Sequence, residues 1–293
     1  MALGSVSPPR SGSHPSPAAV RAAPRIVIPG IFSPVRLRPN AQPARGWSGW
    51  LPSGILAVVI AGLWQALAQS GAIAEFLLPS PASVLRAFWL ALSDGLLPGY
   101  TLTTIQESLT GFALGTLVAL PAGYAIARSP FLARILEPYV AASQALPAVA
   151  LAPLLVLWLG YGLAPVAVLC ALIVFFPTVV NTGLGLRMID GDVLDAARVE
   201  GASWGALLWH IEMPLAAPGI LAGLRSSLTF SVTGAVVGEF VIGDQGLGGL
   251  LNVARGNFDT PLVFATLLSL ALLAALLYGI ARLVERRLSY LEA

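Results

Sequence analysis

Six apolar runs follow one another after residue 50, and each is long enough to cross a lipid bilayer as a helix. A helix that rises 1.5 Å per residue needs roughly 20 apolar residues to cross ~30 Å of hydrocarbon. The chain is therefore predicted to be all-α, a polytopic membrane protein with six transmembrane helices. The predicted spans cover about residues 51–70, 101–127, 136–159, 164–186, 214–242 and 261–283.

The composition agrees with a membrane location. Hydrophobic residues make up 57% of the chain and charged residues only 10%, whereas about a quarter of the residues of a soluble domain are charged. The two histidines, His14 and His210, and the single cysteine, Cys170, lie in unrelated regions. Neither a metal site, which needs several such ligands at close spacing, nor a catalytic residue is therefore predicted.

Lysine is absent from the sequence, because all sixteen basic residues are arginine. The phosphate-binding loop G-x-x-x-x-G-K-[ST] needs its lysine against the terminal phosphates of a nucleotide. The chain is thus predicted to lack this kind of ATP site. The glycine-rich stretch at residues 243–250, GDQGLGGL, does not fit a dinucleotide-binding fingerprint and is interpreted as a turn.

Residues 1–50 differ from the rest of the chain. They contain nine prolines and six arginines, no acidic residue and no sustained periodicity, a composition that cannot bury a core. We predict a disordered Pro/Arg-rich cytoplasmic tail, followed by a membrane domain at residues 51–293. An Arg-rich, acid-poor start is also compatible with an organelle transit peptide or with a start codon assigned too far upstream.

The arginines outside the spans indicate the orientation of the chain. With the N-terminus inside, thirteen arginines fall on the inner side and only Arg86 and Arg255 on the outer side. Cytoplasmic connections carry an excess of basic residues, so both termini and the polar stretch at residues 190–212 are predicted to be cytoplasmic. On the outer side, Ser80 and Pro81 predict the start of a short helix between the first two spans.

A polar elbow, DGDVLDAARVEGASWGALLWHIE, interrupts the apolar runs at residues 190–212. Asp192 is predicted to cap a helix, with Asp195 in its first turn, where the positive helix end favours an acid. Gly201 can take the left-handed conformation that ends helices, and Ser203 can cap a second short helix. The elbow either docks a partner protein or lies on the lipid headgroups. Its excess of acids favours docking, because an anionic leaflet would repel it.

The same stretch resembles a known motif. DAARVEGASWGALLWHIEMPLAAPGI is similar to the EAA motif of ABC-importer permeases, which has an acid and two alanines, three residues, a glycine, and nine residues before Ile-x-x-Pro. The family pattern begins with Glu where this chain has Asp195, which keeps the charge and shortens the reach. The resemblance implies a coupling elbow whose glycine sets the angle between two helices and whose alanines fit a groove of an ATPase. Its residues are Asp195, Ala196, Ala197, Glu200, Gly201, Ala202, Ser203, Ile211 and Pro214.

The resemblance extends from about residue 50 to the C-terminus. LLPSPASVLRAF, LEPYVAASQALPAVALAPLLVLWLGYG, FFPTVVNTGLGLR and GEFVIGDQGLGGLL are similar to permeases of the taurine, sulfonate, nitrate and vitamin-precursor importers. The resemblance implies the type I ABC-importer permease fold and a homodimer in the cell inner membrane. It also implies two partners: a cytoplasmic ABC ATPase that holds ATP and Mg²⁺, and an extracytoplasmic solute-binding protein.

Polar groups inside the predicted spans are candidates for the translocation path or its gate, because an ionisable residue is costly in lipid. The candidates are Glu107, Gln144, Asn181 and Glu239. For each of them, a structural hydrogen bond is the alternative.

Two other classes of function remain open. An ion-coupled secondary transporter would need buried coupling acids near the midplane and usually an internal inverted repeat, and no repeat is apparent. An intramembrane enzyme would need nucleophile and base candidates on facing helices. The sequence leaves two classes of solute open as well: a vitamin precursor, pyrimidine or riboflavin, and a sulfonate, taurine or nitrate.

Overall fold

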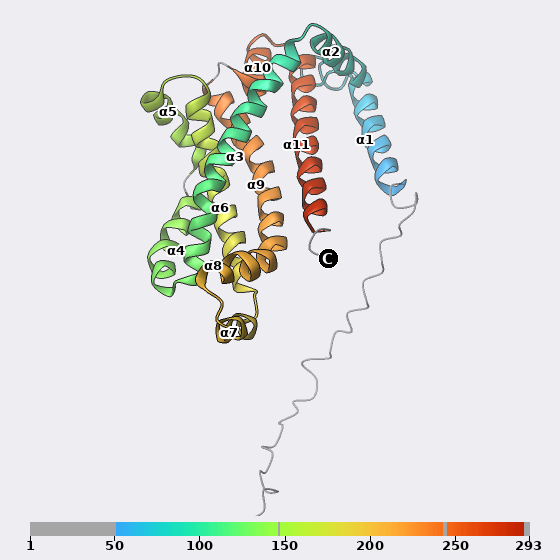
Figure 1. Ribbon diagram of the computed structural model, residues 1–293. Coiled ribbons are helices and arrows are strands. Elements are labelled where there is room, and N and C mark those ends of the chain that lie inside the picture. Colours follow the sequence, from blue (N-terminus) through green and yellow to red (C-terminus); the bar gives the residue numbers. More distant parts are fainter. Residues whose placement is uncertain (1–50, 146, 243–244, 290–293) are drawn as a thin grey trace, which may run out of the picture. The chain divides into compact units, whose positions relative to one another are not determined.

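The computed structural model describes residues 51–145, 147–242 and 245–289, and every regular element in these ranges is a helix (Figure 1). The chain divides into two units, Met1–Leu56 and Ala57–Ala293, and the contacts described below lie within the second. The predicted disordered tail at residues 1–50 lies outside the described residues.

The helices differ in length and character, from the long α3, α9 and α11 to the single turns of the elbow. In chain order they are α1 (Leu51–Gln69), α2 (Pro81–Ser93), α3 (Leu96–Arg128), α4 (Pro130–Ala145), α5 (Ala148–Leu159), α6 (Leu163–Arg187), α7 (Gly191–Val199), α8 (Trp204–Leu207), the π-helix η2 (Leu208–Glu212), α9 (Met213–Ile242), α10 (Gly246–Gly256) and α11 (Thr260–Ser289).

The long apolar helices coincide with most of the predicted spans. Four stretches are long and apolar enough to cross a membrane: α3, α6, α11 and the continuous run Trp204–Ile242. The predicted third span is divided between α4 and α5, and the axes of these two helices differ in direction by 95°. The break lies at Pro147, because proline has no N–H to continue a helix. The predicted first span is α1, a shorter apolar helix. The described residues thus contain four spanning helices, or five if the bent pair is one span.

α3, α6 and α9 form the centre of the second unit, and α6 packs along both of the others. Glycines on α3 allow a close approach to α6. A Cβ on Gly111 would lie 2.2 Å from Cys170 Cβ, and one on Gly115 would lie 2.7 Å from Ala171 O. Membrane helices associate through such small residues, because lipid tails are as apolar as the helices themselves. α3 and α6 therefore meet backbone to backbone.

Two helices outside the long spans, α2 and α10, both lie at the end of the second unit opposite α7 (Figure 1). α2 starts as predicted, with Ser80 Oγ accepting a hydrogen bond from Ser83 N at 3.2 Å. The interpretation of residues 243–250 as a turn is wrong from Gly246 onward, where α10 begins. Side chains of α3 and α9 bond the first turn of α10, and such a tertiary contact leaves no local pattern in the sequence.

Candidate functional site

The elbow consists of two helices joined by a left-handed glycine. α7 ends in a Schellman motif, in which Ala202 N donates to Ala197 O and Gly201 N donates to Arg198 O, both at 3.0 Å. Gly201 has a φ of +87°, the conformation that this motif requires directly after the helix. Ser203 then caps α8, since its Oγ accepts a first-turn N–H at 3.3 Å. The helix, glycine and helix that the sequence predicted are present.

The acidic residues of the elbow are used differently from the prediction. Asp190, not Asp192, caps α7: its Oδ1 accepts a hydrogen bond from Asp192 N at 3.0 Å. The helix therefore begins at Gly191, two residues earlier than the start at Val193 that a cap at Asp192 predicts. Asp195 forms an exposed ion pair with Arg198 at 2.8 Å, so its carboxylate is held on its own helix.

The two alanines of the elbow motif do not share a surface. Ala197 is buried with Leu194 and Leu207 in a small core between α7 and α8, because residues three apart on a helix lie on one face. The prediction that Ala197 presents itself to a partner is therefore wrong, whereas Ala196 is exposed. The buried core makes the elbow a packed unit.

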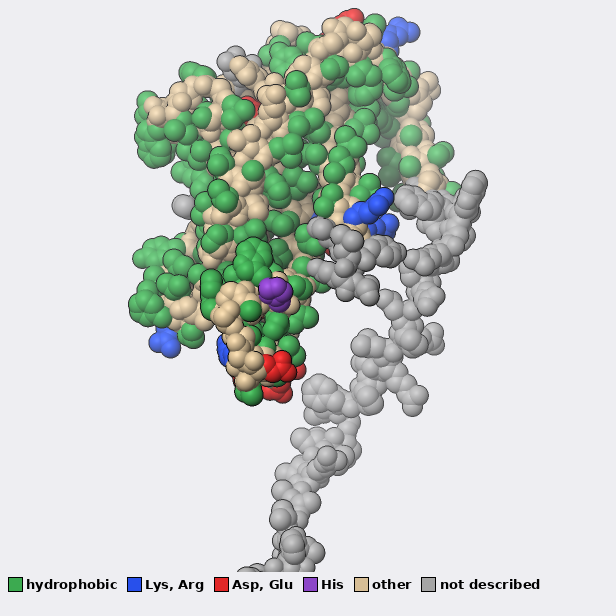
Figure 2. Space-filling view, viewed as in Figure 1, with side chains coloured by type: hydrophobic (Ala, Val, Ile, Leu, Met, Phe, Trp, Pro, Cys, Tyr) green, Lys and Arg blue, Asp and Glu red, His purple; other side chains and the backbone are tan. Residues whose placement is uncertain are grey.

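The exposed face of the elbow combines large apolar side chains with acids. Val199 is 89% exposed, and Trp204 and Trp209 are 69% and 68% exposed. Acidic side chains gather over α7 in the same region (Figure 2). Exposed apolar groups of this kind occur at surfaces that contact either another protein or a membrane.

A buried ion pair ties the elbow to α3. Arg128, the last residue of α3, lies 3.0 Å from Glu212, the last residue of η2, and the Glu212 side chain is only 2% exposed. One turn earlier on α3, the Tyr124 ring meets the Trp204 ring edge-on, with centroids 6.4 Å apart. A displacement of the elbow must therefore act on α3 as well as on α9, which continues directly from η2.

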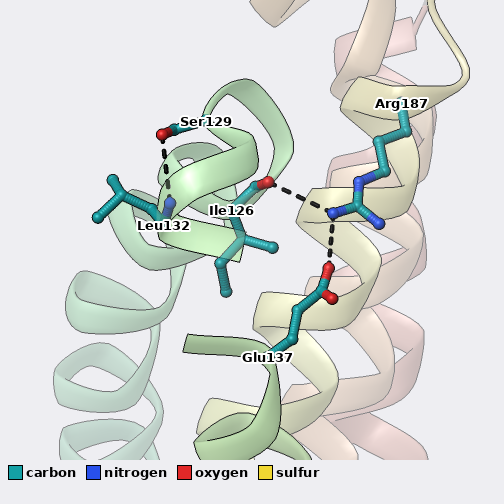
Figure 3. Close-up of polar contacts among 5 residues, drawn as sticks. All are labelled: Ile126, Ser129, Leu132, Glu137 and Arg187. Atoms are coloured by element: carbon teal, nitrogen blue, oxygen red, sulfur yellow. Dashed lines mark hydrogen bonds and ion pairs between the residues drawn. The ribbon is translucent and has the colours of Figure 1, made fainter. Parts of the chain in front are cut away.

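A second set of polar contacts joins α6 to α3 and α4 next to the elbow. Arg187, the last residue of α6, donates through Nη2 to Glu137 Oε1 at 2.7 Å and to Ile126 O at 3.3 Å (Figure 3). At the start of α4, Ser129 Oγ accepts a hydrogen bond from Leu132 N at 3.3 Å. α6, which leads into the elbow, is thus cross-linked to α3 and α4.

Two of the four candidate path residues, Gln144 and Asn181, line one cavity of about 420 Å³ between α4, α5, α6 and α9. The wall of this cavity is mostly apolar and includes Phe175, Phe176 and Phe230. A largely apolar cavity of this size with a few polar groups is typical of a small-molecule site.

The geometry of α6 and α9 fixes Asn181 in this cavity. Its Nδ2 donates to Pro177 O, one turn earlier on α6, at 2.7 Å. Gly223 of α9 leaves room for it, since a Cβ there would lie 2.4 Å from Asn181 Cβ. The Asn181 side chain is therefore held both by its own helix and by its neighbour.

The other two candidates, Glu107 and Glu239, form a separate buried pair and line a different, much smaller cavity. Their residues are 2% and 1% exposed. Glu239 Oε2 accepts a hydrogen bond from Gly248 N of α10 at 2.6 Å. Because α9 runs from the elbow to Glu239, the two pairs of candidates lie at different levels of the same helix bundle. The structure does not bring the four together.

Comparisons with known proteins agree with this architecture. Residues 111–290 match the family described as "Binding-protein-dependent transport system inner membrane component". The chain belongs to this family. It is a transmembrane permease of the binding-protein-dependent, ATP-driven importers, and this membership decides against an ion-coupled secondary transporter.

Relatives of this permease carry the names of several transport systems. The riboflavin transport system permease protein RibX of Chloroflexus aurantiacus is 45% identical over 83% of this chain and 90% of its own length. The putative aliphatic sulfonates transport permease protein SsuC of Bacillus subtilis is 31% identical, covering 84% of this chain and 90% of its own. The formylaminopyrimidine transport permease protein ThiX of Halalkalibacterium halodurans is 31% identical, covering 72% and 84%.

Solved structures show the fold of the permease. A chain of the MetNI methionine ABC transporter, in an inward-facing conformation, matches with a TM-score of 0.58 and 19% identity, covering 66% of this chain and 95% of that one. A second crystal form of MetNI matches with the same TM-score and 17% identity, covering 71% and 97%. The predicted ABC-importer permease fold is thereby confirmed.

Sequence reasoning missed three residues that make central contacts in this permease: Thr104, Arg128 and Glu212. Arg128 and Glu212 both stand at the ends of predicted spans. Because these ends lie on the same side of the membrane, an ion pair between the two opposite charges could have been predicted. Thr104 Oγ1 accepts a hydrogen bond from Leu247 N at 2.9 Å, a contact between residues 143 positions apart. The sequence contains no local signal for that bond.

Proposed function

We propose that this permease forms, with a second copy of itself, the translocation path of an importer in the cell inner membrane. A separate ABC ATPase, which holds ATP and Mg²⁺, docks on the elbow. A solute-binding protein delivers the solute at the opposite, α10 end. Both termini face the cytoplasm in this arrangement, because the elbow has to meet a cytoplasmic ATPase. The chain itself carries out no catalytic step.

The observation that carries the proposal is the exposed face of the elbow. Val199, Trp204 and Trp209 stand out of the elbow although its own core, around Leu194 and Leu207, is complete. The acids beside them would be repelled by an anionic leaflet. Apolar anchors with charge around them suit a protein partner with an apolar groove and basic groups at its rim.

The elbow is suited to pass on a push from the ATPase because it is packed and tied on two sides. Its core joins α7 to α8, η2 continues into α9, and the Arg128–Glu212 pair holds it to α3. When the ATPase closes on ATP, the elbow moves, and α3 and α9 move with it. Reorientation of these helices opens the path to the other side of the membrane.

We infer that the solute is a planar aromatic heterocycle of the flavin or pyrimidine class. The relative named for riboflavin is 45% identical, whereas the relative named for sulfonates is 31% identical. The polar side chains of the 420 Å³ cavity are the hydroxyl of Ser143 and the amides of Gln144 and Asn181. These neutral groups and the phenylalanine rings suit ring nitrogens, carbonyls and a flat aromatic face. A sulfonate would favour arginine-type donors.

The docking proposal is tested by one substitution on the exposed elbow and a matched one elsewhere. Val199→Asp is expected to abolish co-purification of the ATPase encoded with the permease, because it places a charge in an apolar contact. Val253→Asp changes the same residue type on α10, where Val253 is 49% exposed, and is expected to leave co-purification intact. Co-purification of the ATPase with both variants at the wild-type level would refute docking on the elbow.

The solute proposal is tested by uptake into proteoliposomes that contain the permease, its ATPase and its binding protein. We expect ATP-dependent uptake of labelled riboflavin or an aminopyrimidine, and no uptake of an alkanesulfonate. Gln144→Leu, which removes a neutral hydrogen-bonding group from the cavity wall, should lower uptake while ATP hydrolysis continues. Uptake of the sulfonate alone would overturn the solute class but leave the permease function standing.

A further inference from the structure

The carboxyl groups of Glu107 on α3 and Glu239 on α9 line the same small buried cavity. Each residue is nearly inaccessible to solvent, with 2% and 1% exposure. One oxygen of each, Glu107 Oε2 and Glu239 Oε1, has no hydrogen-bond partner among the described residues. Both side chains line a cavity of about 10 Å³, which has room for one water molecule at most.

The charged groups of the neighbouring helices are engaged elsewhere. Arg255 of α10 lies over the Phe240 ring, 5.3 Å from its centroid, and donates to Asn252. Arg128 pairs with Glu212 at the elbow end. The titratable group that α6 brings near the pair is the buried thiol of Cys170, which supplies no positive charge. Two carboxylates in the same small cavity would repel each other strongly in these surroundings.

The first turn of α10 is shaped to receive the Glu239 carboxylate. Gly248 N donates to its Oε2 at 2.6 Å. A Cβ on Gly246 would lie 2.0 Å from Glu239 Oε1, and one on Gly248 would lie 2.8 Å from Glu239 Cβ. Only glycine at these two positions leaves space for the carboxyl group. Since the first turn of a helix favours an anion, Glu239 is the charged member of the pair.

Glu107 lies in different surroundings. No backbone N–H of the described residues donates to it, and the carboxyl of Glu239 is its neighbour in the small cavity. Two buried carboxyl groups that share so small a cavity cannot both be ionised, so one of them carries a proton. The proton therefore resides on Glu107.

We propose that Glu107 and Glu239 bind one proton between them and together form a latch that holds α10 against α3 and α9. The single negative charge lies on Glu239 and bonds the first turn of α10, and Thr104 bonds the adjacent N–H of Leu247 at 2.9 Å. The proton is resident and does not turn over with each transport cycle, because the pair is closed to solvent. The latch is built from residues of this chain alone.

Infrared difference spectroscopy of the full-length permease in lipid nanodiscs tests for the proton. Glu107→Gln keeps the shape of the side chain, so the variant should fold. At neutral pH, the wild-type spectrum minus that of Glu107→Gln should contain the C=O stretching band of a protonated carboxylic acid, shifted in D₂O. Glu137→Gln, at an exposed carboxylate paired with Arg187, should remove carboxylate bands only. Absence of the protonated band from the wild-type difference would overturn the proposal.

Hydrogen exchange at the amides of Leu247 and Gly248 tests the latch. Glu239→Gln removes the anion at the first turn of α10 and should raise exchange there about tenfold or more, as the loss of a charge-assisted hydrogen bond predicts. Glu107→Gln should leave exchange at the wild-type rate and retain transport. Equal opening of α10 in both variants would overturn the latch. Loss of uptake in folded Glu107→Gln, with the latch closed, would overturn the resident proton and indicate proton turnover.

Discussion

Gly111 has no side chain, and this allows α3 to pack closely against α6. Gly111→Ala would place its Cβ 2.2 Å from Cys170 Cβ and 2.6 Å from Ala167 O. Such overpacking should lower the free energy of unfolding by about 1–3 kcal/mol. Thermal unfolding of the purified permease, followed by tryptophan fluorescence, measures the effect.

The matched control for this change is Gly99→Ala on the same helix, where an added Cβ meets nothing within 4 Å. Alanine has the higher helix propensity, by about 1 kcal/mol, so Gly99→Ala should be neutral or stabilising. If both alanines gave the same midpoint, close packing at Gly111 would not be what limits stability.

The Arg128–Glu212 pair makes a second prediction at the scale of single residues. Glu212→Gln leaves the partly buried Arg128 guanidinium, 24% exposed, without its counter-charge, which should cost about 3 kcal/mol of stability. It should also loosen the elbow from α3. Chemical denaturation in detergent measures the loss.

A similar substitution in an exposed pair separates the effect of burial from that of charge. Glu137 and Arg187 lie 2.7 Å apart with side chains about half exposed, and Glu137→Gln should cost less than about 1 kcal/mol. A loss as large as that of Glu212→Gln would show that exposure does not decide the strength of these pairs.

The candidate residues show how far sequence reasoning reached at this scale. Apolar context alone identified Glu107 and Glu239 as acids within predicted spans, and the structure shows that both are buried. It could not show that they meet each other, because that contact depends on how α3 and α9 pack and on the glycines of α10. Gln144 and Asn181 were found by the same reasoning, and their shared cavity is again a product of packing between helices.

At the scale of elements, the elbow depends on one left-handed residue. Gly201→Val forces a β-branched side chain into a φ of +87°, which should cost about 1–2 kcal/mol or reshape the Schellman turn. The angle between α7 and α8 should change, so the ATPase should still hydrolyse ATP while uptake per ATP falls. Parallel assays of hydrolysis and uptake in proteoliposomes measure this ratio.

Gly191→Val is the control within the same elbow. Gly191 begins α7 with an ordinary backbone conformation, and an added Cβ meets nothing within 4 Å. This variant should transport with normal coupling. Reduced coupling in both variants would indicate that the added side chains collide with the ATPase. Normal coupling in both would show that the left-handed conformation of Gly201 is not needed for coupling.

Elements were predictable from the sequence where their signals are local. The long spans follow from apolar length, and the start of α2 follows from Ser80 and Pro81. α10 was missed because its glycines break the usual helix signals, and its first turn is bonded by Thr104 and Glu239 from other helices. The shift of the α7 cap from Asp192 to Asp190 has a different reason. The sequence offers two aspartates in suitable positions, and the backbone path from α6 decides between them.

At the scale of the whole membrane unit, one helical run connects the two sites. Trp204–Ile242 passes without interruption from the elbow, through the cavity wall at Phe230, to Glu239 beneath α10. A stiff helix carries a displacement along its length, whereas coupling through it should weaken if the helix becomes flexible. We therefore expect α9 to transmit a displacement of the elbow to the contact between Glu239 and α10.

The last prediction softens α9 without touching either end. Ser226→Gly with Thr233→Gly replaces two exposed residues whose hydroxyls bond only within α9, and each glycine costs helix propensity of about 0.5 kcal/mol. The ATPase should still bind and hydrolyse, but uptake per ATP should fall several-fold. Ala271→Gly with Ala275→Gly makes a change of equal or greater cost at exposed positions of α11, which does not lead from the elbow, and should leave coupling unchanged. If the α11 variant lowers uptake per ATP as strongly as the α9 variant, the displacement is transmitted by the whole helix bundle and not by α9 alone.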